Sequence, residues 1–184
     1  YPQLAFEAGD AMALRFPDDS FDAAVSGLLL NFLPDAAVAA QEMRRVVRPR
    51  GMVAAHVWDY ADRMELLRHF WDAATAIDPA AAALDEGRRF LICDPGALTS
   101  LFREAGLEAV ETAYIDQPIV FRDFDDCWKP FLGGQGPSGG YAMGLSEEAR
   151  ERFRAHLQAA LPANRDGGIP MILRAWAVRG LRPP

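Results

Sequence analysis

A carboxylate and a backbone N–H stand next to each other in the run Gly9-Asp10-Ala11. The residues before them, Leu4 to Ala8, predict a short strand, which places the pair at a strand's carboxyl end, where ligands bind in open α/β sheets. There Asp10 can accept hydrogen bonds from an adenine amino group, and the N–H of Ala11 can donate to a ring nitrogen. These residues therefore predict one side of a nucleotide-binding site.

A second group of candidate residues ends the next expected strand. This strand, Asp22 to Ser26, is apolar on both faces, as a strand buried between two helix layers should be. Gly27 and Leu28 follow it directly, and Asn31 comes three residues later. Because ligands of such sheets bind at the carboxyl ends of the strands, we expect these residues to lie near Asp10.

Three motifs, taken in their order and spacing, resemble the class I S-adenosylmethionine-dependent methyltransferases (methyltransferase type 11-like). They are Gly9-Asp10-Ala11, Phe16-Pro17-Asp18-Asp19-Ser20-Phe21-Asp22 and Ala40-Gln41-Glu42-Met43-Arg44-Arg45-Val46-Val47-Arg48-Pro49-Arg50-Gly51. The resemblance implies a Rossmann-like, three-layer α/β/α fold with strand order 3-2-1-4-5-7-6. It also implies an enzyme that transfers a methyl group from S-adenosylmethionine to a small-molecule acceptor.

The resemblance further implies roles for the candidate residues. Asp10 and Ala11 would contact the adenine of the cofactor, although a strand-end aspartate can instead cap a turn. Ser26, Gly27 and Leu28 would lie beside the methionine portion, where the family's carbonyls meet the ammonium group. The alternative for Gly27 is that it has no ligand role and only lets another group approach its backbone closely.

Asn31 occupies a place where related enzymes often carry a histidine near the transferred methyl group. We therefore expect Asn31 to contact the substrate without acting as a base. A sulfonium is already activated, so orientation of the two reactants can supply most of the acceleration. No catalytic residue is assigned from the sequence.

Two parts of the family pattern are not found in the sequence. These are the first strand with its glycine-rich loop and the second strand with its ribose-binding acid; Gly9 is the only glycine before Gly27. We therefore expect an N-terminally truncated domain that lacks the first two strands, and such a domain can be inactive by itself. The alternative is a truncated or degenerate methyltransferase-like domain that does not bind cofactor and folds as a dimer or interaction module.

The expected truncation has a consequence for assembly. It would leave the strand Asp22–Ser26 as an exposed apolar edge, and such an edge invites pairing with another chain. We therefore predict either a homodimer through this edge or a rearranged pairing of Leu4–Ala8.

The remaining elements follow from caps, breakers and hydrophobic periodicity. Helices are expected at 35–47, 62–77, 95–105 and 146–161, and strands at 52–58, 107–115 and 169–179. We expect one domain over 1–184, in which 60–93 and 118–165 are insertions that cover the substrate. Within the second insertion, 121–144 is expected to be a mobile loop. Its literal G-x-G-x-x-G at 134–139 does not predict phosphate binding, because it follows no strand and contains Pro137.

Aromatic residues of these insertions, together with Trp58 at the end of the strand 52–58, suggest an acceptor pocket. Trp58, Tyr60, Trp128 and Tyr141 would line it if the inserted segments fold over the edge of the sheet. The alternative is that these side chains belong to an ordinary hydrophobic core.

Composition limits the function classes. A net charge of −7 over 184 residues, with one lysine, argues against a nucleic-acid partner. The two cysteines and the acidic residues near 123–126 lack the spacing of a metal site, so no metal is expected. No apolar stretch is long enough for a membrane span, and we expect a cytoplasmic protein. The arginine- and alanine-rich composition suggests a GC-rich, bacterial genome.

Overall fold

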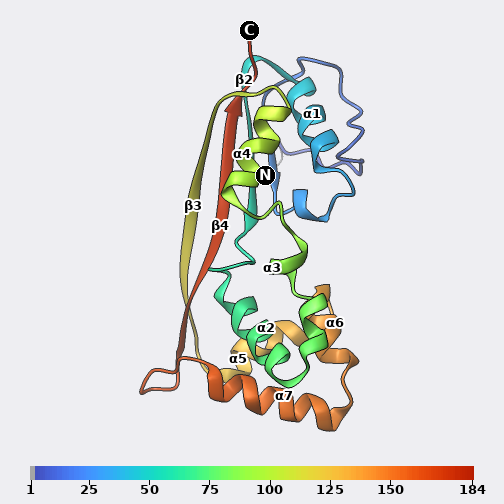
Figure 1. Cartoon of the computed structure of the whole chain (residues 1–184). Coiled ribbons are helices and arrows are strands. Elements are labelled where there is room, and N and C mark those ends of the chain that lie inside the picture. Colours follow the sequence, from blue (N-terminus) through green and yellow to red (C-terminus); the bar gives the residue numbers. More distant parts are fainter. Residues whose placement is uncertain (1–2) are drawn as a thin grey trace. The chain divides into compact units, whose positions relative to one another are not determined.

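The computed structural model describes residues 3–184, which form two compact units (Figure 1). Unit 1 comprises Tyr1–Val57, Pro95–Ala113 and Ala177–Pro184. Unit 2 comprises Trp58–Asp94 and Tyr114–Trp176, so both segments expected as insertions fall within it.

Four strands form one mixed sheet. They are β1 (Phe21–Gly27), β2 (Val47–Trp58), β3 (Glu108–Phe121) and β4 (Ile169–Leu181), in the order β1-β2-β4-β3. β1 and β2 are parallel, with Ser26 opposite Ala55 and Gly27 opposite His56. The order β1-β2-β4-β3 corresponds to strands 4, 5, 7 and 6 of the order 3-2-1-4-5-7-6 that the resemblance implies. The mixed α/β, Rossmann-like fold class is therefore confirmed.

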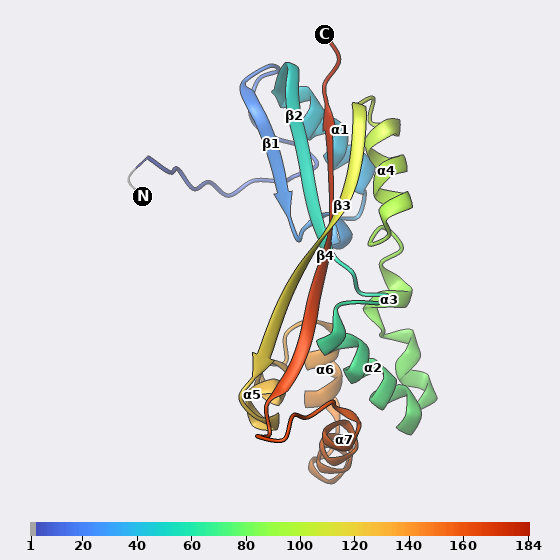
Figure 2. The same ribbon diagram turned by 90° about the vertical axis from the view of Figure 1, so that its left-hand side faces the viewer.

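In unit 1, the helices α1 (Ala36–Val46) and α4 (Pro95–Glu104) lie on the same side of the strands (Figures 1 and 2). On β2, Val53, Ala55 and Val57 are buried, whereas the residues that alternate with them are more exposed. The described residues of unit 1 thus supply a helix layer for one face of the sheet, whereas the expected three layers would cover both faces.

The prediction of an opening strand at Leu4–Ala8 is wrong. Residues 4–9 form no strand, and only an isolated bridge joins Asp10 to Ala13. Leu4 and Phe6 are exposed, and the chain does not pair Leu4–Ala8 with another of its own segments, so the rearranged pairing is also wrong for this chain. The physical reason is that an extended segment becomes a stable strand only when a neighbour satisfies its backbone.

The third sequence motif forms the junction between α1 and β2. Asp35 caps α1 by accepting from the N–H groups of Ala37 and Val38, at 2.9 and 3.1 Å. The helix ends at Val46, and β2 begins at once, five residues earlier than the expected start at Met52. A side chain at Gly51 would lie 2.6 Å from the Asp22 carbonyl oxygen, so this start of β2 requires glycine.

Unit 2 is helical, with a ribbon of β3 and β4 beside its helices. Its α-helices are α2 (Glu65–Ile77), α3 (Glu86–Arg89), α5 (Phe124–Trp128), α6 (Gly136–Gly144) and α7 (Glu147–Ala160); two 3-10 helices, η2 (Pro79–Ala83) and η3 (Lys129–Gly133), join them, and a third, η1 (Leu30–Phe32), lies in unit 1. Phe70, Phe131 and Phe153 pack at its centre, with ring centroids 4.4 and 4.9 Å from Phe70.

The mobile loop expected at 121–144 is also wrong, because α5, η3 and α6 occupy this segment. At Gly139 a side chain would lie 3.1 Å from the backbone carbon of Gly134. Glycine therefore lets η3 and α6 pack closely, and Gly134 takes the left-handed conformation that ends η3.

Candidate functional site

Two adjoining hollows lie in unit 1, and Ala11 and Leu14 line both of them. One, of about 210 Å³, is lined by residues 7–11 and 14–16. The other, of about 260 Å³, lies at the carboxyl end of β1 and is lined by Ala11, Leu14, Ala24, Val25, Ser26, Gly27, Leu29, Leu30, Ala39 and Met43. The structure thus brings three of the predicted cofactor residues, Ala11, Ser26 and Gly27, to one hollow, and places Asp10 in the adjoining one.

Two polar side chains at this end of β1 are buried without a hydrogen-bond partner among the described residues. Ser26 is 7% exposed and Asn31 is 8% exposed, and neither the Ser26 Oγ nor the Asn31 Nδ2 is paired. Buried polar groups are usually hydrogen-bonded, and an unpaired one costs about 1–3 kcal/mol. These atoms fit a site that is completed by a polar ligand.

The backbone between these two residues is strained. Leu28 has a φ of 54°, in the left-handed region that non-glycine residues rarely adopt. Its N–H donates to the His56 carbonyl oxygen at 2.8 Å, which holds the turn against the end of β2. The imidazole of His56 lies beside Gly27, 3.1 Å from where a side chain at that position would begin. Gly27 therefore allows a close approach.

Asp10 caps a local turn. Its Oδ1 accepts from the Met12 N–H at 2.8 Å, and its carbonyl oxygen accepts from the Ala13 N–H at 3.1 Å. The turn-capping alternative is therefore realised in the structure. Within residues 3–184 no hydrogen bond engages the second carboxylate oxygen of Asp10, so a role in adenine recognition stays a prediction.

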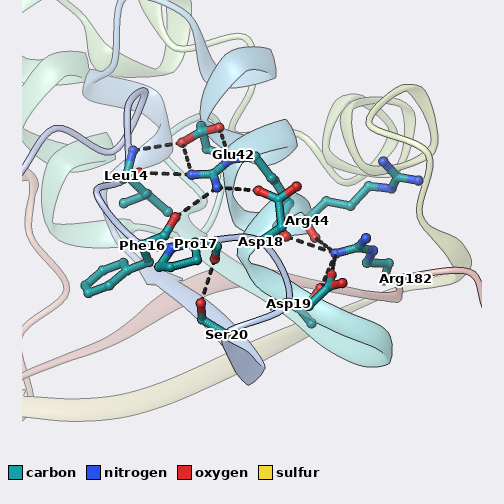
Figure 3. Close-up of polar contacts among 11 residues, drawn as sticks. Leu14, Phe16, Pro17, Asp18, Asp19, Ser20, Glu42, Arg44 and Arg182 are labelled. Carbon is teal, nitrogen blue, oxygen red and sulfur yellow. Dashed lines mark hydrogen bonds and ion pairs between the residues drawn. The ribbon is translucent and has the colours of Figure 1, made fainter.

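An arginine and a glutamate of α1 hold the segment that follows Asp10 (Figure 3). Arg45 donates to both Glu42 carboxylate oxygens, at 2.7 and 2.8 Å, and to Asp18 Oδ1 at 2.7 Å. It also donates to the carbonyl oxygens of Leu14 and Phe16, each at 2.9 Å. Glu42 Oε2 in turn accepts from the Leu14 N–H at 2.8 Å. We call Glu42 and Arg45 the α1 clamp.

The charges of the α1 clamp stabilise each other. The hydrogen bond from Arg45 is the main cause that lowers the pKa of the Glu42 carboxyl. The same bond, together with that to Asp18, raises the pKa of Arg45 further above its ordinary range. Both groups are therefore charged at neutral pH. Sequence reasoning did not single out this pair, although both residues belong to the third motif and stand three positions apart on one helix face.

The four aromatic residues predicted to line the acceptor pocket all lie in unit 2. Trp128 is buried and packs 5.8 Å from Phe153, and Tyr141 packs 5.8 Å from the same ring. Tyr60 is buried and packs 5.6 Å from Phe90, and Trp58 ends β2. Packing alone explains Trp128 and Tyr141 without a ligand. Their roles in acceptor binding remain predictions.

Unit 2 also buries two neighbouring acids. Asp85 pairs with Arg68 at 2.6 Å and accepts from the Gly87 N–H. Glu86 accepts from the indole N–H of Trp71, and burial is the main cause that raises the pKa of the Glu86 carboxyl. No cavity adjoins these groups among those described, so we read them as structural.

Residues 3–184 contain no cluster of histidine, cysteine or acidic side chains that could hold a metal ion. Both cysteines are buried, which raises the pKa of the Cys93 and Cys127 thiols to about 12. Among the helices described, none is long and apolar enough to cross a membrane.

Comparison with known proteins agrees with the geometry of unit 1. Residues 1–55, which carry both hollows and the α1 clamp, match the family model described as a methyltransferase domain. The resemblance to class I methyltransferases is confirmed. The matched segment contains the predicted cofactor residues Asp10, Ala11, Ser26, Gly27 and Leu28, as well as Asn31.

Curated methyltransferases resemble the chain over part of their length. A 2-methyl-6-phytyl-1,4-hydroquinone methyltransferase of Synechocystis is 42% identical over 67 residues, which are 36% of this chain and 21% of the relative. A demethylmenaquinone methyltransferase of Roseiflexus castenholzii is 42% identical over 104 residues, which are 56% of this chain and 41% of the relative. The chain thus spans about a fifth to two fifths of the length of these methyltransferases.

Solved structures share the fold. A structure assigned to a methyltransferase of an antibiotic biosynthesis pathway in Anabaena variabilis has a TM-score of 0.60 and 21% identity, covering 96% of this chain and 74% of that one. The YcgJ protein of Bacillus subtilis has a TM-score of 0.54 and 22% identity, covering 97% and 71%. At these identities the similarity concerns the methyltransferase fold alone.

Proposed function

We propose that this chain carries part of the site of an S-adenosylmethionine-dependent methyltransferase that acts on a small molecule. The observation that carries the proposal is the hollow at the carboxyl end of β1. It adjoins Asp10 and Ala11 and includes Ser26, whose buried hydroxyl has no partner among the described residues. Carboxyl ends of parallel strands are the usual ligand position in this kind of sheet.

The residues present fit two regions of the cofactor. Asp10 and Ala11 would hold the adenine, and Ser26, Gly27 and Leu28 would lie beside the methionine portion. When bound, the sulfonium supplies an already activated methyl group. Asn31 is a neutral amide, so it would orient the acceptor without removing a proton.

The nature of the acceptor is supported by the relatives. The relatives are named as methyltransferases of 2-methyl-6-phytyl-1,4-hydroquinone and of demethylmenaquinone, and we propose a small-molecule acceptor for this chain too. Trp58, Tyr60, Trp128 and Tyr141 of unit 2 are the proposed acceptor-side residues.

Calorimetry with S-adenosylhomocysteine tests the cofactor site. We expect micromolar binding by the chain, and a loss of binding in Asp10→Ala. Asp72→Ala, which removes an exposed carboxylate from α2, is the matched control and should bind like the parent chain. Ser26→Ala should weaken binding while it stabilises the free protein by about 1 kcal/mol, because it removes an unpaired buried hydroxyl.

Absence of binding by the parent chain would contradict the proposal for the chain as it stands. It would favour a methyltransferase-like domain that folds without cofactor. Equal binding by Asp10→Ala would instead remove Asp10 from the site.

A further inference from the structure

All five donors of one arginine are used, and three of them bind a segment that has no regular secondary structure. A guanidinium carries five N–H donors in a fixed planar fork. Arg45 makes five hydrogen bonds, two to Glu42 and one each to Asp18, Leu14 and Phe16. Its side chain is only 31% exposed and that of Glu42 only 19%, so water competes weakly for these bonds.

The α1 clamp binds both polar backbone groups of Leu14, its N–H and its carbonyl oxygen. Glu42 accepts from the Leu14 N–H, and Arg45 donates to the Leu14 carbonyl oxygen (Figure 3). Leu14 lines both hollows together with Ala11. The bonds from Met12 and Ala13 back to Asp10 connect Leu14 to the predicted cofactor residues through one short turn.

Little else fixes this segment. Between residues 3 and 20 the structure has no helix or strand, and every residue from Gln3 to Asp10 is exposed. A coil without a ladder or a buried face keeps one conformation only where specific bonds hold it. Other contacts act further along the segment and do not reach Leu14: the ring of Phe16 packs 4.9 Å from that of Phe21, and Asp19 binds the Arg45 carbonyl oxygen and Arg182.

We propose that Glu42 and Arg45 are positioning residues, which fix Leu14 on α1 and thereby set Asp10 and Ala11 against the end of β1. The part of this inference that concerns cofactor affinity rests on the proposed function. Neither side chain lines either hollow, so the effect on the ligand passes through the backbone of residues 10–14.

The test compares Arg45→Met, Arg45→Lys and Glu42→Gln with Arg48→Met. The control variant removes an arginine that makes a single exposed ion pair with Asp22, at 2.9 Å, in the same unit. For each variant we would measure amide hydrogen exchange, thermal unfolding and the affinity for S-adenosylhomocysteine.

We expect Arg45→Met to speed exchange at the Leu14 and Met12 amides by about tenfold or more, while the α1 amides keep their protection. Cofactor affinity should fall by about tenfold or more, with Arg48→Met unchanged. Arg45→Lys should not restore affinity, because one ammonium group cannot span Glu42, Leu14 and Phe16 at once. Glu42→Gln keeps an acceptor for the Leu14 N–H, so it should fold and show an intermediate loss.

Three outcomes would overturn the inference. They are unchanged Leu14 exchange in Arg45→Met, parental affinity in that variant, and full rescue by lysine. If Arg45→Met does not fold, Glu42→Gln decides by the same readings. If the parent chain binds no S-adenosylhomocysteine, the proposed function fails, and exchange at Leu14 and Met12 still decides whether the α1 clamp positions the turn.

Discussion

Two short, neutral side chains at the end of β1 each bury an unpaired polar atom, whereas the other such atoms among the described residues are the Nε groups of three arginines. Ser26 and Asn31 leave side-chain atoms unpaired, whereas the buried Asp85 and Glu86 of unit 2 find partners within the chain. A folded protein keeps an unpaired buried group at a cost to stability. At the residue scale, the pair at the end of β1 therefore fits ligand binding, and the acids of unit 2 fit a structural role.

Glu86 provides a prediction on pH dependence. Because burial raises the pKa of its carboxyl above the ordinary 4.5, the folded state binds the proton more tightly than the unfolded state. The free energy of unfolding then falls as pH rises from 4.5 through the raised pKa, and it stays lower above it. Glu86→Gln removes this cost and keeps an acceptor for Trp71.

We expect Glu86→Gln to be more stable than the parent chain at pH 8, with the difference shrinking toward zero below pH 4.5. Urea unfolding at pH 8 and below pH 4.5, monitored by tryptophan fluorescence, measures this difference in the free energy of unfolding. Glu151→Gln, at an exposed position of α7, should show no such pH-dependent difference. A stability gain of equal size at both pH values would show that ionisation of Glu86 is not its source.

At the scale of elements, α1 is the support of the candidate site. It carries both residues of the α1 clamp, and Ala39 and Met43 from the same helix line the hollow at the end of β1. Its start depends on Asp35, which satisfies two of the free N–H groups of the first turn.

We expect Asp35→Ala to lower the free energy of unfolding by about 1 kcal/mol, the usual cost of losing such a cap. Asp35→Asn and Asp35→Ser should retain most of the stability, since both side chains can cap. Urea denaturation of the three variants gives the values. If alanine and asparagine were equally tolerated, the cap would not contribute to the stability of α1.

The sequence predicted most elements and missed those that depend on distant contacts. Periodicity and caps located α1, α2, α4 and α7 to within a few residues. The helix α6 was missed because glycine disfavours helices, and only its close packing at Gly139 against Gly134 explains it. The strand at Leu4–Ala8 was wrongly expected, because local composition favours an extended segment but does not supply a partner, and no described strand pairs with these residues.

The candidate site was predicted only in part, because some of its contacts also join residues far apart in the sequence. The order of motifs pointed to Asp10, Ala11, Ser26 and Gly27, which the structure gathers around two adjoining hollows. The α1 clamp was missed, because its bonds run to backbone atoms 28 and 31 residues away and leave no side-chain pattern at Leu14.

At the scale of the whole molecule, β1 is a free edge. Among the described strands it pairs only with β2, and its Val25 is 67% exposed. Edge strands with exposed apolar side chains tend to pair with other chains. Self-association through β1 therefore stays a prediction.

We expect Val25→Lys to reduce self-association, because a charge on an edge strand opposes pairing. Sedimentation velocity over a range of concentrations would show a shift from dimer toward monomer. Val38→Lys places the same charge at an exposed valine of α1 and should leave the dimer intact. A parent chain that is monomeric at all concentrations would contradict the prediction.

The α1 clamp also bears on how this segment can change during evolution. Apart from Asp18, the side chains of Glu42 and Arg45 bind, outside α1, backbone atoms of Leu14 and Phe16. Every residue type offers these atoms, proline lacking only the N–H. Arg15, between Leu14 and Phe16, is exposed. Sequence drift at position 15 can therefore proceed with little penalty, whereas at position 16 it would cost the ring contact of Phe16 with Phe21. A homologous segment could keep its place on α1 while its side chains adapt to another ligand.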